Sequence, residues 1–238
     1  MEKISPKYKR VLLKLSGEAL AKDCCSILNF EYIESIAEVL KRCVAEGVQI
    51  AIVVGAGNIW RGRQSGKMDR AKADQMGMLA TAINSLALEE TFNSVGLKSR
   101  AMMVMEVNSF ADPYRIRDAR RHLEEGEVVI IGGGTGMPFF STDTAAAIHA
   151  AEVGADVILM AKNIDGIYTA DPKVDPTARR YDEITYREIL DKELKALDIP
   201  ASAFCMENDI RCYAFELKDP NNIYRVIMGE KLGTELHR

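Results

Sequence analysis

Short runs of apolar residues alternate along this 238-residue chain with segments of helical periodicity. The runs at residues 11–16, 48–54, 127–131 and 157–161 are largely apolar and lack the polar alternation of a half-exposed strand. Strands of that kind belong to sheets covered on both faces, and a β–α–β order gives parallel strands with right-handed crossovers. The pattern therefore predicts an α/β protein, a three-layer αβα sandwich with a mainly parallel central sheet.

The remaining elements are predicted from apolar spacing and from helix start and stop residues. Helices are expected over residues 31–46, 72–93, 114–124, 144–153, 185–194 and 201–208, with a short one after Pro220. Further strands are expected over 100–105, 211–217 and 226–228. Thr142 or Asp143 is the expected cap of the helix over 144–153. The sequence contains no linker or repeat, so we expect a single domain over 1–238 with two lobes, about 1–140 and 141–238.

Composition and charge exclude several classes of protein. The chain is 47% hydrophobic and 28% charged, with a net charge of −4, so its overall field does not favour nucleic acid. It has no apolar stretch of about 18 residues and no signal-peptide pattern, which predicts a cytoplasmic protein with no membrane partner. Its five cysteines form no metal-binding or redox spacing and are expected to be free thiols.

Three glycine-rich corners each follow a predicted strand, at residues 15–18, 55–58 and 132–136. Glycine lets backbone N–H groups approach an anion without a clash from a side chain. One such corner is most simply a tight turn, but three at the carboxyl ends of one sheet favour a phosphate site, because ligands of such sheets bind there. The spacings of a P-loop and of a dinucleotide-binding motif are both absent.

Three charged residues lie in or beside these corners. Lys14 interrupts an apolar strand, and a buried lysine needs an anion, although a lysine at a strand end can also reach solvent. Arg61 follows the second corner, and its planar guanidinium suits phosphate oxygens, although a solvated loop arginine is also possible. Asp143 follows the third corner and would orient Lys14 or a metal-bound phosphate, if it is not simply a helix cap.

Five blocks of sequence, in order and spanning nearly the whole chain, resemble the bacterial uridylate kinases of the amino acid kinase superfamily. The blocks are residues 12–19, 74–81, 134–143, 165–172 and 226–234. The resemblance implies the amino acid kinase fold and reversible phosphoryl transfer from ATP to UMP, giving UDP and ADP in pyrimidine nucleotide synthesis. It also implies Mg²⁺ bound with ATP mainly through the nucleotide phosphates, a homohexamer, and feedback inhibition by UTP.

The resemblance assigns roles to residues by position, with the acceptor side in residues 1–140 and the ATP side in 141–238. Lys14, Arg61 and Asp143 would act in catalysis. The residues expected to bind ATP are Lys14, Leu15, Ser16, Gly17, Gly57, Arg61, Lys162, Asn163, Tyr168 and Asp171. The residues expected to bind UMP are Gly55, Ala56, Asp74, Thr135, Gly136, Met137, Pro138, Phe139, Phe140, Ser141 and Thr142.

This sequence departs from its relatives at a few positions. Ala56 stands where many have glycine, and Met137 where asparagine is common. Residues 22–28 lack the glycine-rich stretch that is tied to GTP activation in many relatives, which leaves activation by GTP open. Phe139 and Phe140 would form a wall for the base, or would simply fill the core. The apolar face of the helix over 72–93, with Met76, Leu79 and Ile83, is interpreted as core or as a subunit contact.

Two other functions remain as alternatives. A kinase of a carboxylate or carbamate would share the fold, but the aromatic loop after Pro138 offers no partner for an ammonium group. A nucleotide-binding storage or regulatory protein would keep the fold without turnover, and Lys14, Arg61 and Asp143 together argue against such a loss. Phosphoryl transfer to a phosphate monoester needs no general base, because the acceptor is already largely dianionic at neutral pH.

Overall fold

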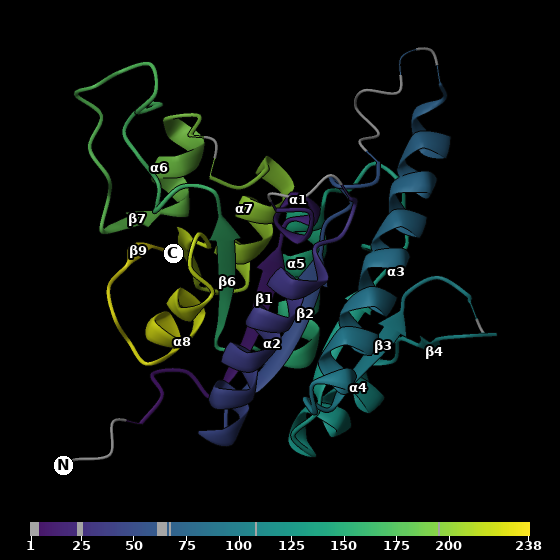
Figure 1. Ribbon diagram of the computed structural model, residues 1–238. Coiled ribbons are helices and arrows are strands. Elements are labelled where there is room, and N and C mark those ends of the chain that lie inside the picture. Colours follow the sequence, from purple (N-terminus) through teal and green to yellow (C-terminus); the bar gives the residue numbers. More distant parts are fainter. Residues whose placement is uncertain (1–4, 23–25, 61–65, 67, 108, 195) are drawn as a thin grey trace.

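The computed structural model describes residues 5–22, 26–60, 66, 68–107, 109–194 and 196–238. Within these ranges the strands form one nine-stranded sheet in the order β4-β3-β5-β2-β1-β6-β8-β9-β7. The pairs are parallel, except that β8 and β9 are antiparallel. β1 is therefore the middle strand, with β2 on one side and β6 on the other. Figure 1 shows the sheet between two layers of helices, as the apolar strands predicted.

The bounds of the elements follow the expected alternation. The strands are β1 (Arg10–Leu15), β2 (Gln49–Val54), β3 (Ser99–Met103), β4 (Asp112–Pro113), β5 (Val128–Gly132), β6 (Val157–Lys162), β7 (Glu183–Thr185), β8 (Cys212–Glu216) and β9 (Gly233–His237). The helices are α1 (Gly17–Leu20), α2 (Phe30–Ala45), α3 (Arg70–Ser94), α4 (Ile116–Glu124), α5 (Thr142–Val153), α6 (Tyr186–Asp191), α7 (Ile199–Glu207) and α8 (Asn221–Ile227).

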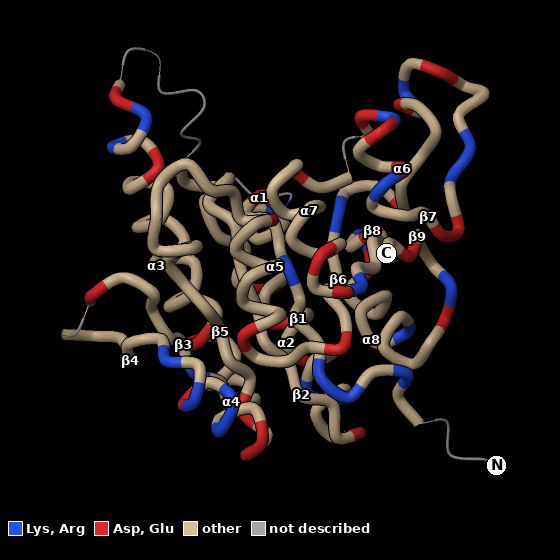
Figure 2. The backbone as a smooth tube through the Cα atoms, turned by 180° about the vertical axis from the view of Figure 1, so that it is seen from behind, with Lys and Arg blue, Asp and Glu red and all other residues tan. Residues whose placement is uncertain are grey.

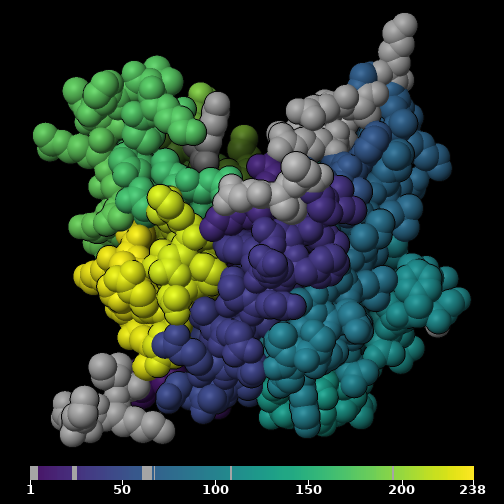
Figure 3. Space-filling model, in the orientation of Figure 1, coloured from purple at the N-terminus to yellow at the C-terminus, as the bar shows by residue number. Residues whose placement is uncertain are grey.

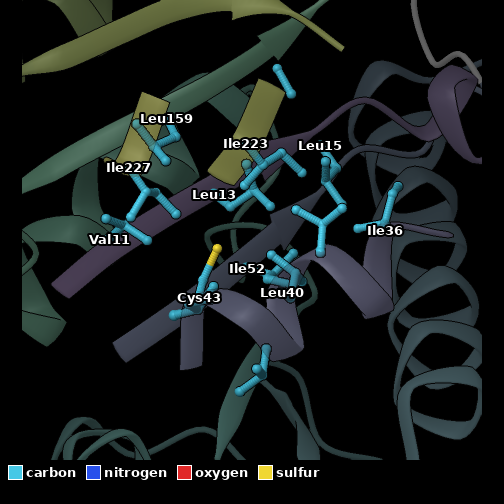
Figure 4. Close-up of a cluster of buried hydrophobic side chains, with 14 of the residues drawn as sticks. Val11, Leu13, Leu15, Ile36, Leu40, Cys43, Ile52, Leu159, Ile223 and Ile227 are labelled. Atoms are coloured by element: carbon cyan, nitrogen blue, oxygen red, sulfur yellow. The ribbon is translucent and has the colours of Figure 1, made fainter. Parts of the chain in front are cut away.

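The two faces of the sheet carry separate hydrophobic cores. Val11, Leu13 and Leu15 of β1 lie on one face, against apolar side chains of α2, α3 and α8; Figure 4 shows the part of this cluster between β1, α2 and α8. Leu12 lies on the other face, in the core shared with α4, α5, α6 and α7. Because side chains of a strand alternate between the faces, Lys14 is on the same face as Leu12, toward α5.

Side chains cap most of the longer helices. Asn29, Asp69 and Asp198 each accept a hydrogen bond from a backbone N–H in the first turn of α2, α3 and α7. The cap of α5 is Ser141, whose hydroxyl accepts from the N–H groups of Asp143 and Thr144. The prediction of Thr142 or Asp143 as this cap is therefore wrong by one or two residues. With Ser141 satisfying these donors, the carboxylate of Asp143 is available for another partner.

The sequence-based prediction is also wrong at the edge of the sheet. Residues 226–228 were expected to form a strand, but Val226 and Ile227 end helix α8, where they are buried against the sheet. The strand that follows α8 is β9, which lies between β8 and β7 and has Leu236 as its one large apolar side chain. Asp112 and Pro113, where no strand was predicted, form the two-residue strand β4 beside β3. Short apolar runs cannot be assigned to helix or strand by periodicity alone.

Cys43, Cys205 and Cys212 are free thiols, as expected, whereas Cys24 and Cys25 lie outside the described residues. None of the described helices is long and apolar enough to cross a membrane. Basic and acidic segments are interspersed over the backbone in Figure 2, for example along α4.

The fully buried Leu13 on the middle strand provides a test of the core. Leu13→Ala should lower the free energy of unfolding by about 3 kcal/mol, because it removes buried methyl groups and leaves a cavity between β1, α2 and α8. Urea denaturation followed by circular dichroism measures this change. Val174→Ala is the matched control at an exposed position (81%) and should change stability by less than about 0.5 kcal/mol. An equal effect of the two variants would contradict the position of Leu13.

Candidate active site at the carboxyl ends of the strands

Two lysines and an aspartate meet at the carboxyl ends of β1 and β6. The Nζ of Lys14 lies 2.9 Å from Oδ1 of Asp143, which is in the first turn of α5. Lys162 ends the neighbouring strand β6, on the same face of the sheet by strand alternation, because Ile158 and Met160 belong to the core on that side. Its Nζ donates to the carbonyl of Ala196 at 2.5 Å. The arrangement brings two cationic groups and one carboxylate to one point, as the sequence predicted for Lys14 and Asp143.

Burial lowers the pKa of the Lys162 amine, and nearby Lys14 lowers it further, while Asp143 opposes both. An amine in this position is poorly solvated by the protein alone. A ligand that brings negative charge therefore gains more from Lys162 than it would from a solvated lysine.

The first two glycine corners touch each other because residue 17 has no side chain. A Cβ on Gly17 would lie 2.6 Å from the carbonyl oxygen of Gly55 and 2.7 Å from the backbone nitrogen of Gly57. The hydroxyl of Ser16 caps the short helix α1 by accepting from the N–H of Ala19. The close approach of two backbones is the physical reason for glycine at this point.

Polar side chains of α3 form hydrogen bonds with the backbone of the second and third glycine corners. Asn84 is fully buried and donates to the carbonyl of Gly55 at 2.8 Å, and it exchanges hydrogen bonds with Asn58. One turn earlier, the hydroxyl of Thr81 accepts from the N–H of Gly133 at 2.9 Å. A single helix thus fixes the second and third corners, a role that the sequence analysis did not assign to it.

A pocket of about 720 Å³ lies between these corners and α3, large enough for a small ligand. Phe139 and Phe140 line it and are exposed by 65% and 45%, so they do not fill the core. The carboxylate of Asp74 accepts from the N–H of Phe139 at 2.9 Å and pairs with Arg70. The predicted site residues that line this pocket are Lys14, Ala56, Gly57, Asp74, Thr135, Met137, Phe139, Phe140, Ser141, Thr142, Asp143 and Lys162.

A second pocket, of about 820 Å³, adjoins the first at Lys162, which lines both. Asn163, Tyr168 and Asp171, three of the residues predicted to bind ATP, line it together. The hydroxyl of Tyr168 donates to Asp165 at 2.9 Å, and this hydrogen bond raises the pKa of the tyrosine. Figure 3 shows the surface hollowed at its upper rim between the segment around residue 170 and the N-terminal part of the chain.

The structure does not bring every predicted residue to a pocket wall. Gly55, Gly136 and Pro138 lie in the corners and loop beside the first pocket without lining it. Leu15, Ser16 and Gly17, which follow Lys14 in the chain, do not line it either. Arg61 lies outside the described residues. Residues that sequence reasoning missed include Asp198, which lines the first pocket and accepts from the hydroxyl of Thr144. An aspartate before a proline-containing helix start is a signal that could have located it.

Carboxylates and histidines gather at one further place among the described residues. His122, Glu125 and Glu127 have ligand atoms within 4.8 Å of one another, at the opposite end of the sheet from the pockets. Arg100 pairs with Glu127, and Arg121 pairs with Glu125 and contacts the ring of His122. Because two arginines already neutralise the two carboxylates, we assign no metal to this cluster.

The desolvated amine of Lys162 should cost stability. Replacing it in Lys162→Met should raise the free energy of unfolding at pH 7 by about 1 kcal/mol, measured by urea denaturation. At a pH below the lowered pKa that Lys162 has in the folded protein, the amine is charged in both the folded and the unfolded state. Folding then carries the full cost of desolvating the charge. This cost disappears as the pH rises through the folded pKa toward the unfolded value of about 10.4, so the advantage of the variant shrinks there.

The control for this measurement is Lys98→Met, at an exposed position, which should leave stability within about 0.5 kcal/mol. A Lys162→Met variant that is less stable than the wild type at pH 7 would show that the ion contacts outweigh the desolvation.

The chain is similar to known proteins over most of its length. The amino acid kinase family matches residues 9–215. The crystal structure of UMP kinase from Bacillus anthracis has 36% sequence identity and a TM-score of 0.93, covering 97% of this chain and 96% of that one. UMP kinase from Ureaplasma parvum has 36% identity and a TM-score of 0.92, covering 98% and 100%. The chain therefore belongs to the amino acid kinase family, in its group of UMP kinases.

Proposed function

We propose that this protein transfers the γ-phosphoryl group of ATP reversibly to UMP, giving ADP and UDP, as a step of pyrimidine nucleotide synthesis. The observation that carries the proposal is the pair of pockets that meet at Lys162, with the Lys14–Asp143 ion pair beside their junction. Two nucleotides bound in these pockets would bring their phosphates together at the lysines. The likeness to two UMP kinases over nearly the whole chain supports UMP as the acceptor.

In this proposal the first pocket binds UMP and the second binds the adenine nucleotide. The aromatic side chains of Phe139 and Phe140 offer apolar surface to a base, and Asp74, which already fixes the backbone at Phe139, contacts the nucleoside. The roles named for individual residues in the sequence analysis, and the division into an acceptor side and an ATP side near residue 140, are part of the proposal. An amino acid acceptor would instead need partners for an ammonium and a carboxylate group.

The described groups suit phosphoryl transfer, which depends mainly on positioning and on stabilising charge. UMP has a second phosphate pKa of about 6 and attacks as a dianion, so no side chain has to remove a proton. Lys14 and Lys162 approach the phosphates, while Asp143 holds the Lys14 amine in one orientation. The N–H groups of the glycine corners supply further donors.

Mg²⁺ fits this site as an ion that arrives with ATP. It takes oxygen ligands and is commonly held by one or two carboxylates together with substrate phosphates. Asp143 and Asp198 both line the first pocket, and the described residues there include no cluster of three ligating side chains that would hold the ion alone. When bound, the ion would neutralise charge on the transferred phosphoryl group.

The proposal extends to assembly and regulation. The exposed side chains of Met76, Leu79 and Ile83 lie at helical spacing on the outer face of α3, which supports their interpretation as a subunit contact in a homohexamer. UTP would inhibit by occupying the UMP pocket.

We make no proposal on activation by GTP, because part of the segment 22–28 lies outside the described residues. We place the enzyme in the cytoplasm.

The direct test is release of ADP from Mg-ATP in the presence of UMP, CMP, dTMP or glutamate, each offered alone. Strong turnover with UMP and weak turnover with the other acceptors is the expected result. Glutamate has neither a base for the apolar walls nor a phosphate for the glycine corners, and the likeness to UMP kinases favours UMP over CMP and dTMP. Turnover with glutamate would show that the acceptor is a carboxylate and not UMP. Tight ATP binding without turnover on any acceptor would favour a storage or regulatory protein.

Lys14→Ala tests the ion pair in catalysis. We expect kcat with UMP to fall about 10²–10³-fold, the loss typical of one preorganised donor to a developing charge. Steady-state kinetics measure the change, and Lys98→Ala at an exposed position is the control that should retain full activity. Nearly full kcat in Lys14→Ala, with the fold retained by circular dichroism, would remove Lys14 from the mechanism.

A further inference from the structure

His149 is a buried titratable residue to which the proposed chemistry assigns no role. It lies in α5 with only 3% of its surface exposed. Its Nδ1 is 2.7 Å from Oε2 of Glu152, and its Nε2 is 2.9 Å from the carbonyl oxygen of Gly134 in the third glycine corner. The ring therefore bridges the interior of α5 and the wall of the first pocket, which Gly134 lines.

Both partners of the ring require a proton from it. A carbonyl oxygen can only accept, and an ionised carboxylate can only accept. A neutral imidazole has one N–H and would leave a nitrogen lone pair facing one of these oxygens at hydrogen-bond distance. The hydrogen bond from His149 lowers the pKa of the Glu152 carboxyl, although burial opposes it, which supports the ionised carboxylate. The geometry is thus satisfied by an imidazolium that donates from both nitrogens.

The groups around the ring fit this charge. The hydroxyl of Tyr114, just before α4, donates to the same Oε2 of Glu152 at 2.9 Å, and its ring packs edge-on against the imidazole at a centroid distance of 5.0 Å. From α4, Arg120 donates to the backbone carbonyl of Glu152 at 2.8 Å. Glu152 is the acidic partner in this group, so it carries the counter-charge for His149. His149 is therefore part of a buried hydrogen-bond network and does not serve only as packing in the core.

The bond to Gly134 fixes the orientation of one peptide plane in the acceptor loop. The peptide bond between Gly134 and Thr135 is trans, so the carbonyl that faces His149 and the N–H of Thr135 point in opposite directions. Gly133 and Gly134 both have positive φ, 92° and 61°, where the backbone of glycine turns easily. The hydroxyl of Thr81 accepts from the N–H of Gly133, and His149 contacts the carbonyl of Gly134, so two side chains restrain this pair of glycines.

We propose that His149, protonated on both ring nitrogens, is a positioning residue that holds the Gly134 carbonyl and so aims the N–H of Thr135 into the acceptor pocket. Loss of a proton from the ring places a lone pair against the Gly134 carbonyl, because the remaining N–H stays with Glu152. The peptide then turns, and the pocket binds its ligand more weakly. The kinetic part of this inference rests on the proposed function, whereas the protonation state does not.

The first measurement is the protonation state of the ring by NMR of the full chain labelled with ¹⁵N-histidine. The chain has three histidines, so the variants His122→Gln and His237→Gln assign the signal of His149 by elimination without altering it. At neutral pH we expect the nitrogen shifts of an imidazolium for His149. Shifts of a neutral ring at that pH would overturn the proposal, whether or not the protein turns over UMP.

The second measurement is the pH dependence of KM for UMP and for ATP between about pH 6.5 and 9.5, where the phosphate of UMP is already a dianion. KM for UMP should rise about tenfold across the titration that NMR reports for His149, the effect of losing about one hydrogen bond. KM for ATP should not follow that titration. In His149→Gln, whose amide can still donate to Gly134 but cannot ionise, the rise in KM should be absent.

Two further variants separate positioning from general destabilisation. His122→Gln removes another buried histidine, at the far end of the sheet, and should retain the wild-type pH profile. Glu152→Gln removes the counter-charge and should move the titration of His149 to lower pH, with the rise in KM moving with it. A rise in KM for UMP that is unchanged in both His149→Gln and Glu152→Gln would refute the role of the ring. Absence of any turnover in the wild type would refute the proposed function, and the NMR result would stand apart from it.

Discussion

The ion pair between Lys14 and Asp143 joins the middle strand of the sheet to the first turn of α5. A lysine at this place on an otherwise apolar strand would be costly to bury without an anion, and Asp143 supplies that anion only because Ser141 caps the helix in its stead. The pair therefore ties the first turn of α5 to the middle of the sheet. Lys14 also lines the first pocket, where a negatively charged ligand would give its amine a second anionic partner besides Asp143.

The glycine corners around this pair have little rigidity of their own, and polar side chains of the neighbouring helices supply it. Asn84 and Thr81 of α3 hold the second and third corners, and His149 of α5 holds the third from the other side. Backbone N–H groups can act as preorganised anion donors only when their peptide planes are fixed. The buried polar residues of two helices thus belong to the site as much as the glycines do.

The sequence predicted the four central strands because each is an apolar run closed by a turn signal. It failed at β9 and at residues 226–228, because β9 has only one large apolar residue and the apolar run at 226–228 ends helix α8. In the site, Lys14 and Asp143 were predictable as charges beside glycine corners. Asn84, Thr81 and His149 were not, because a polar residue inside a helix shows its partner only once the helix is packed. Arg61 and the roles of individual residues remain predictions.

Helix α3 has two faces with different functions. Its inner face carries Thr81 and Asn84, which fix the corners of the site, and Met76, Leu79 and Ile83 lie exposed on its outer face. A second subunit packed on that outer face would contact the same helix that holds the backbone of the second and third glycine corners. Ligand binding in one subunit would then change the affinity for its neighbour, and packing of the neighbour would change the affinity for the ligand by the same factor. Cooperativity between subunits would need no separate communicating segment, because one helix already connects the interface to the pocket.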